Sequence, residues 1–154
     1  MLAQLGFAQS NPCVSLVALY VKPCVNANFC SGSFEGENEM VRFKVGDQAI
    51  NIADITLTWP NNAFLGLSAP NATTQVKTLQ YNNTVNNSCG KLIESTNGIL
   101  PANADVFIVS STNACANANF FQNLSITSYI LYQNSGNIAS HFTNYNSVSS
   151  NVPF

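Results

Sequence analysis

The apolar residues of this chain occur in short runs, and most runs are closed by asparagine, glycine or proline. Asparagine supplies 23 of the 154 residues and lies mostly between these runs. It suits turns because its side chain bonds nearby backbone groups and because it tolerates left-handed backbone angles. Many turns between short apolar runs are typical of an all-β protein, and the length corresponds to one domain with a sizeable core.

Six runs have the pattern of β-strands, at residues 14–21, 39–45, 55–59, 91–94, 105–110 and 126–132. The first is apolar on both faces, which predicts a buried strand. The second and third alternate between apolar and polar residues, as half-buried strands do. Thr73 to Tyr81 predicts one short helix, capped by Thr73 or Thr74. The elements favour a β-sandwich of about seven strands with one short helix.

Charged residues make up 8% of the chain, whereas about 25% is usual in globular proteins. The net charge is −2 and no basic patch is present, so nucleic acid is not expected as a partner. Low charge also weakens the repulsion between copies, which suits a protein that packs against itself or stays tethered. The same composition fits neutral drift in a secreted protein.

Residues 1–8 are apolar and end in Gly6-Phe7-Ala8 before the polar Gln9, like the end of a signal peptide. The basic residues that open a signal peptide are missing. Two interpretations stay open, a signal-peptide remnant and an N-terminal apolar strand of the folded protein. In the second, Leu2, Leu5 and Phe7 would insert into a neighbouring subunit. Residues 9–154 form a single β-sandwich domain in both, and no run is long enough to span a membrane.

The chain has five cysteines: Cys13, Cys24, Cys30, Cys89 and Cys115. A zinc site would need about four thiolate or imidazole ligands at short spacings, but the chain has no Cys-x-x-Cys motif and one histidine. Disulfides formed in an oxidising compartment are therefore favoured. Several pairings are possible. We expect Cys24–Cys30 to close the short loop between them, with Cys89 bridged to Cys13 or Cys115.

Three of the seven acidic residues, Glu35, Glu37 and Glu39, lie at alternating positions ahead of an apolar strand. Calcium takes six to eight oxygen ligands, and acids at this spacing supply several of them. A solvated loop leading into an edge strand explains the same pattern without a ligand. Calcium is the one cofactor that the sequence suggests, and the loop is the simpler explanation.

The sequence offers little for catalysis. His141 is the single candidate base, no Gly-x-Ser-x-Gly motif is present, and no carboxylate pair is evident, so we expect no enzymatic activity. His141 is expected at the surface or at a strand end. The aromatic residues, among them Trp59, Phe64, Tyr81 and Tyr132, fit a buried core or a platform on which sugars stack.

Three segments occur in a suggestive order: EGENEMVRFKVG (35–46), AINIADITLTW (49–59) and GILPANADVFIV (98–109). This order resembles the lamin-tail type of immunoglobulin-like domain. The chain departs from that family in Arg42, which replaces an acid, in Asn103, which replaces a glycine, and in a long insert at 60–90.

The first segment, together with FAQSNPC (7–13), ITLTWPNNAFLG (55–66), CGKLIE (89–94), the stretch from Gly98 to Cys115 and HFTNY (141–145), more closely resembles another module. That module belongs to large secreted surface proteins of Bacteroidota associated with gliding motility and type IX secretion. The resemblance spans most of residues 9–145. It implies an extracellular, adhesin-like β-sandwich that is exported through a signal peptide and has no catalytic residues.

We therefore expect a non-catalytic extracellular module with a structural or adhesive function at the cell surface, able to assemble into filaments. The alternative is a carbohydrate- or calcium-binding module. The expected partners are copies of the chain or neighbouring domains of a larger surface protein, with surface glycans as a further candidate.

Overall fold

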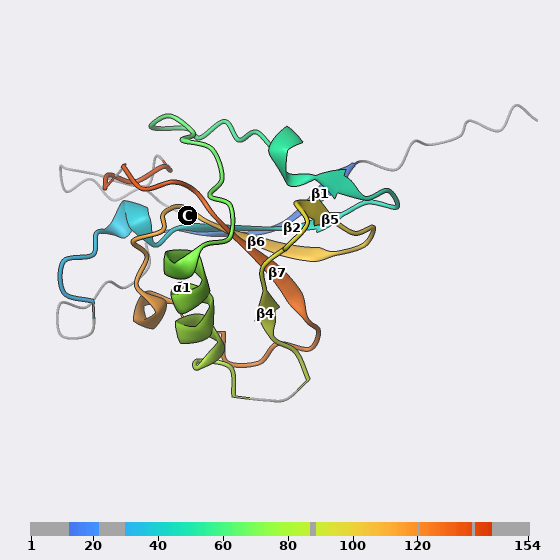
Figure 1. The fold of residues 1–154 in the computed structure, drawn as a ribbon. Helices are drawn as coiled ribbons and strands as arrows, with labels where there is room; N and C mark the ends of the chain where they lie inside the picture. Colours follow the sequence, from blue (N-terminus) through green and yellow to red (C-terminus); the bar gives the residue numbers. More distant parts are fainter. Residues whose placement is uncertain (1–12, 22–29, 87–88, 120, 137, 143–154) are drawn as a thin grey trace, which may run out of the picture.

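The computed structural model describes residues 13–21, 30–86, 89–119, 121–136 and 138–142 (Figure 1). These residues form seven strands, one α-helix and three short 3-10 helices. The strands are β1 (Val14–Tyr20), β2 (Met40–Val45), β3 (Ile50–Asn51), β4 (Leu92–Ile93), β5 (Ile99–Leu100), β6 (Asp105–Val109) and β7 (Ser128–Tyr132). The helices are α1 (Ala72–Asn82), η1 (Glu35–Glu37), η2 (Ile52–Asp54) and η3 (Ala116–Ala118).

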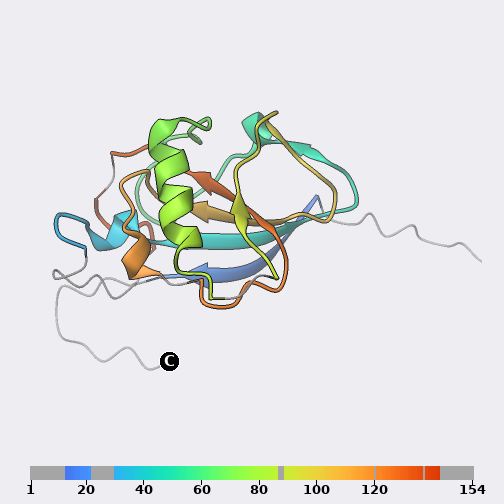
Figure 2. The same ribbon diagram turned by 60° about the horizontal axis from the view of Figure 1, so that its bottom comes forward.

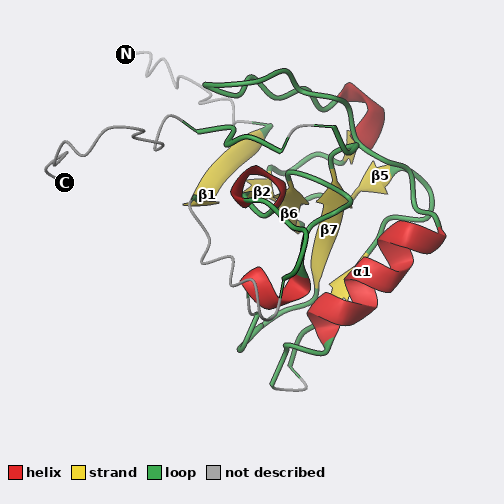
Figure 3. Cartoon of the chain, turned by 90° about the vertical axis from the view of Figure 1, so that its left-hand side faces the viewer, coloured by secondary structure: helices red, strands yellow, loops and turns green. Residues whose placement is uncertain are grey.

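Five strands form an open, mixed sheet in the order β1-β2-β6-β7-β4. The β1–β2 and β2–β6 pairs are antiparallel, whereas β6–β7 and β4–β7 are parallel. Strands β3 and β5 form a separate two-stranded antiparallel sheet. Figures 2 and 3 show β1, β2, β6 and β7 in a row, with β1 at its end.

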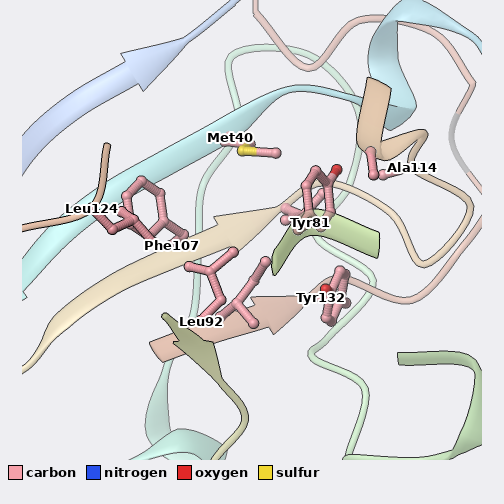
Figure 4. Close-up of a cluster of buried hydrophobic side chains, with 10 residues drawn as sticks. Met40, Tyr81, Leu92, Phe107, Ala114, Leu124 and Tyr132 are labelled. Carbon is pink, nitrogen blue, oxygen red and sulfur yellow. The ribbon is translucent and has the colours of Figure 1, made fainter. Parts of the chain in front are cut away.

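The large sheet is covered on both faces because its central strands are apolar on both. On one face Met40, Phe107 and Tyr132 pack with Tyr81 of α1 and with Leu92 of β4 (Figure 4). On the other face the strands pack against Leu100 of the small sheet and against the segment that follows β3. The strand side chains in this contact are Phe43, Val45, Val106, Ile108 and Leu131. The prediction of a β-rich fold with two sheets and one short helix is confirmed at this level.

The predicted helix is present and is longer by one residue at each end. Its cap is Asn71 and not Thr73 or Thr74, as the sequence had suggested. The Asn71 side chain accepts hydrogen bonds from the backbone N–H groups of Thr73 and Thr74, and the Thr74 hydroxyl accepts one from the backbone N–H of Asn71. The arrangement is a reciprocal capping box that leaves fewer backbone donors unpaired at the start of the helix.

Two strand predictions are wrong in part. Residues 55–59 form no strand, although Ile55, Leu57 and Trp59 are more buried than the threonines between them. The alternation therefore reports one buried face, while the backbone has no neighbouring strand to pair with. Strand β1 forms as predicted, but it is largely exposed because it ends the sheet.

One disulfide connects residues that lie 85 positions apart, Cys30 and Cys115. The predicted Cys24–Cys30 pair and the Cys89–Cys115 alternative are therefore wrong, since each cysteine forms one bridge. Cys13 and Cys89 are exposed free thiols, so the second alternative is wrong as well. Cys24 lies outside the described residues. The bridge joins the loop before η1 to the loop before η3, which a local pairing rule could not anticipate.

We expect the double variant Cys30→Ala/Cys115→Ala to lose about 2–5 kcal/mol of unfolding free energy, because a closed loop of this length restricts the unfolded chain. Urea titration monitored by Trp59 fluorescence measures the loss. Cys89→Ser, at an exposed free thiol, is the matched control and should leave the midpoint unchanged. Peptide mapping without reduction should recover Cys30 linked to Cys115, and a Cys24–Cys30 peptide would contradict the structure.

Two tyrosines are enclosed in the core beneath α1, and burial raises the pKa of both Tyr81 and Tyr132 well above the ordinary value. The hydroxyl of Tyr132 meets that of Thr78 at 3.0 Å. The hydroxyl of Tyr81 has no hydrogen-bond partner among the described residues, and it points toward Ala114 (Figure 4).

Above about pH 10 the unfolded chain releases the tyrosine protons, while the folded chain retains them. The unfolded state then binds fewer protons, so stability falls as the pH rises, by about 1.4 kcal/mol per pH unit for each tyrosine. We expect Tyr81→Phe to reduce the loss of unfolding free energy between pH 10 and 11 by the contribution of one tyrosine. At pH 7 the variant should be at least as stable as the parent, because no hydrogen bond is lost. Urea titrations at both pH values test this, and an unchanged alkaline slope would contradict it.

Candidate functional site

The most exposed apolar surface of the described chain follows strand β1. Among the described strands, β1 has a neighbour on one side only, so its outer backbone N–H and C=O groups face solvent. Its large side chains are exposed on both faces of the sheet: Val14, Leu16, Val17, Leu19 and Tyr20. A strand of seven residues with this composition is an open template for another strand.

Natural edge strands usually carry a charge, a proline or a bulge that discourages pairing. Strand β1 contains no charged residue and no proline. Its register with β2 shifts between Leu16 and Ala18, which places one bulge at Val17. The bulge interrupts the ladder toward β2, and on either side of it the strand remains regular. Strand β1 therefore has one of the usual protective features and lacks the others.

An apolar groove of about 570 Å³ runs beside β1 on the face that carries the small sheet. We call it the β1 groove. Its apolar walls come from β1, β2, β3 and the segment after η2, with side chains of Val14, Leu16, Phe43, Ile50, Ile55 and Leu57. The groove exists because β3 and β5 have two residues each and leave this end of the large sheet uncovered.

The opposite end of β2 is closed by a buried polar network around Glu39, which comes directly before the strand. Glu39 accepts hydrogen bonds from the backbone N–H of His141 at 2.7 Å, from His141 Nδ1 at 3.1 Å and from the Ser140 hydroxyl at 2.5 Å. Glu39, His141 and Gln133 have no exposed surface. Because a buried carboxylate is costly without donors, this network fixes the 138–142 segment across the start of β2.

Hydrogen-bond roles in this network follow from Trp59, whose Nε1–H can only donate. It donates to Gln133 Oε1 at 2.7 Å, so Gln133 Nε2 faces the carbonyl of Ser110 and His141 Nε2. His141 Nε2 must then accept, and the ring proton sits on Nδ1 and is donated to Glu39. The imidazole is therefore neutral here, and both of its nitrogens are occupied inside the protein.

His141 was expected at the surface or at a strand end, and that prediction is wrong. Its ring packs against the ring of Trp59 with the centroids 5.0 Å apart and the planes tilted by 56°, and it is fully buried. Little in the sequence indicated this, since Glu39 and Trp59 lie far from His141 along the chain and Gln133 lies eight positions before it. The one sequence feature that favoured a buried position for His141 was that it is a lone histidine in an apolar, weakly charged chain.

The three glutamates considered for calcium have different environments. Glu37 accepts hydrogen bonds from the backbone N–H of Phe34 and from Asn113 Nδ2. Glu39 belongs to the buried network, and Glu35 opens the short 3-10 helix η1, within the stretch that the sequence predicted as a loop. In the described part of the chain no three His, Cys, Asp or Glu residues are grouped closely enough to hold a metal. Calcium binding stays a prediction from the sequence.

Arg42 does not pair with these glutamates. Its guanidinium forms two hydrogen bonds to Asp105, at 2.9 and 3.1 Å, and lies 5.1 Å from the ring centre of Phe107. The hydrogen bonds to Asp105 raise the pKa of Arg42. Because Ser128 also donates to Asp105, this pair ties β2, β6 and β7 together. The contact is structural, and no local pattern in the sequence indicated it.

Of the other predicted site residues, Leu2, Leu5 and Phe7 lie outside the described residues. Among the aromatic residues, Trp59, Tyr81 and Tyr132 are buried in the core, so they form no exposed platform for sugars. Phe64 is half-buried at a pocket between the region of the small sheet and β7. Cys13 lines the start of the β1 groove as a free thiol.

Comparison with known proteins finds no matching family model, no matching curated protein and no matching solved structure. Within the described residues, α1 is the longest helix, and none has the length and apolar character needed to cross a membrane.

We expect His141→Ala to reduce the unfolding free energy by about 3–5 kcal/mol, because it removes a buried donor to Glu39 and leaves a cavity beside Trp59. Urea titration at pH 7 measures the change. Asp54→Asn, at an exposed carboxylate, is the control and should change stability by less than about 0.5 kcal/mol. A loss below about 1 kcal/mol in His141→Ala would show that the network does not hold the fold.

Proposed function

We propose that this chain is a non-catalytic extracellular module with a structural or adhesive function at a cell surface, and that it associates through strand β1. The observation that carries the proposal is the exposed apolar edge of β1 beside an apolar groove. Strand addition uses the free backbone groups of such an edge for affinity and a neighbouring groove for specificity. The partners are copies of the chain or neighbouring domains of a larger surface protein.

Edge-to-edge pairing of β1 would join its free backbone groups, but it would cover only part of the exposed apolar side chains, because these stand on the two faces of the sheet. Association that uses both the edge and the β1 groove would bury more. The low charge of the chain adds little repulsion to oppose such contacts.

We propose further that the fold is an immunoglobulin-like sandwich of the lamin-tail type. Two sheets facing each other across an apolar core, with Phe43 and Leu100 on the facing sides, support it. The parallel β6–β7 and β4–β7 pairs are a departure from the antiparallel sheets of immunoglobulin domains. The Cys30–Cys115 bridge supports passage through an oxidising compartment, as expected of an exported surface protein.

The buried state of His141 supports a function without catalysis. Both ring nitrogens bind inside the protein, to Glu39 and Gln133, and the ring does not reach solvent. A general base must come within hydrogen-bond reach of the proton that it removes. This histidine is therefore committed to the fold.

The substitution Leu16→Lys tests the proposal, because it places a charge in the centre of the β1 edge. Leu79→Lys on α1 is a matched control, since Leu16 and Leu79 are 65% and 64% exposed. We expect the full chain to form dimers or filaments at about 100 μM in sedimentation velocity and electron microscopy. Leu16→Lys should abolish them and Leu79→Lys should not, with thermal midpoints preserved in both. A parent chain that stays monomeric at this concentration would overturn self-association through β1.

A further inference from the structure

A second, polar groove lies on the other face of the large sheet, away from the β1 groove. It has a volume of about 780 Å³ and runs between α1, the loop that contains Cys30 and the η3 region. Figures 1 and 2 show η3 beside α1. We call it the amide groove after the side chains that line it: Gln80, Asn83, Asn86, Asn117 and Gln122, together with Lys77.

These six side chains make no hydrogen bond to any described residue. Several amide side chains elsewhere in the described chain are engaged in the structure. Asn38 donates to Ser33 and to the carbonyl of Phe34 and accepts from the backbone N–H of Cys115, and Asn71 caps α1. Each free amide offers two donors and a carbonyl acceptor. The five amides thus offer about 15 donors and acceptors that the fold itself does not use, and Lys77 adds about three N–H donors.

Among the described residues that line this groove, Lys77 is the one that is basic. It is half-buried, and no carboxylate lies within salt-bridge distance of it in the described residues. Burial lowers its pKa, and the nearby Glu37 opposes that shift. Glu37 is already bound to Phe34 and Asn113, so it does not move toward the lysine. A half-buried ammonium without a paired anion favours an anionic group from a ligand.

The walls of the groove are held in place. The Cys30–Cys115 bridge joins its two loops covalently, and Asn38 links them a second time through its bond to the backbone of Cys115. Asn119 Nδ2 donates to the carbonyl of Asn38 at 2.6 Å and fixes the end of η3. Such preorganisation reduces the entropy lost when a ligand binds.

We propose that the amide groove binds a saccharide that carries a carboxylate. Amide and hydroxyl groups match the hydroxyls of a sugar, and the ammonium of Lys77 matches the carboxylate. Among the described residues that line the groove, none is an aromatic on which a neutral sugar ring would stack, so recognition depends on hydrogen bonds and on this charge. The inference goes beyond association through β1 and does not rest on it, because the two grooves have no described residue in common.

Calorimetric titration of the full chain with tetragalacturonic acid tests the inference, with the neutral galactose tetramer as the matched ligand. EDTA in both solutions removes calcium, which could bridge carboxylates. We expect the acidic tetramer to bind, the neutral one to bind at least about tenfold more weakly, and Lys77→Met to remove this preference. Lys91→Met, at an exposed lysine outside the groove, should behave as the parent does.

The double variant Asn117→Ala/Gln122→Ala should weaken the binding of both tetramers. Its thermal midpoint should not change, because these side chains make no hydrogen bond to any described residue. Leu16→Lys should bind the acidic tetramer as the parent does, which separates this test from the one on β1. Equal binding of the two tetramers by the parent chain would overturn the carboxylate specificity. No binding of either at 10 mM would overturn the site.

Discussion

The Glu39 carboxylate has no contact with solvent, and the surrounding structure is arranged to satisfy it. Its donors, Ser140 and His141, lie 101 and 102 positions further along the chain, so the end of the described chain has to cross the start of β2. That segment also holds Asn61, whose backbone N–H donates to the carbonyl of His141. Gly36 passes so close to Ala139 that a side chain at this position would collide with its backbone. One buried carboxylate thus organises three separate stretches, at 36–39, at 61 and at 139–141.

The local patterns of the sequence were sufficient for most of the fold. Alternation along β2, the apolar run of β6 and the helical spacing of α1 each reflect a period that the backbone imposes. Trp59 shows the limit of this reasoning. An alternating pattern reports which side is buried, whereas a strand also needs a neighbour at hydrogen-bonding distance. The parallel β6–β7 pair could not be predicted either, because pairing partners are set by the packing of the whole chain.

The proposed binding surfaces were harder to predict than the fold. The apolar run of β1 was visible, but its exposure depends on which strand ends the sheet, and a buried central strand has the same composition. The amide groove is built from residues of α1 and the η3 region that become neighbours only after folding. The Cys30–Cys115 bridge was not predicted for the same reason, because its two cysteines become neighbours only after folding. Short spacing along the sequence favoured a Cys24–Cys30 pair. The abundance of asparagine predicted turns, yet several asparagines line a groove.

The antiparallel pairing of β1 with β2 has a consequence for a protein held under tension. Val14 pairs with Val45, whereas His141 binds Glu39 just before Met40, so the described chain starts and ends near opposite ends of β2. A pull applied at Cys13 and Phe142 would act along the strands. The hydrogen bonds of the β1–β2 ladder would then bear the load together in shear, without opening one after another. Under load the lifetime of the fold would depend on this ladder and on the barrier to its rupture.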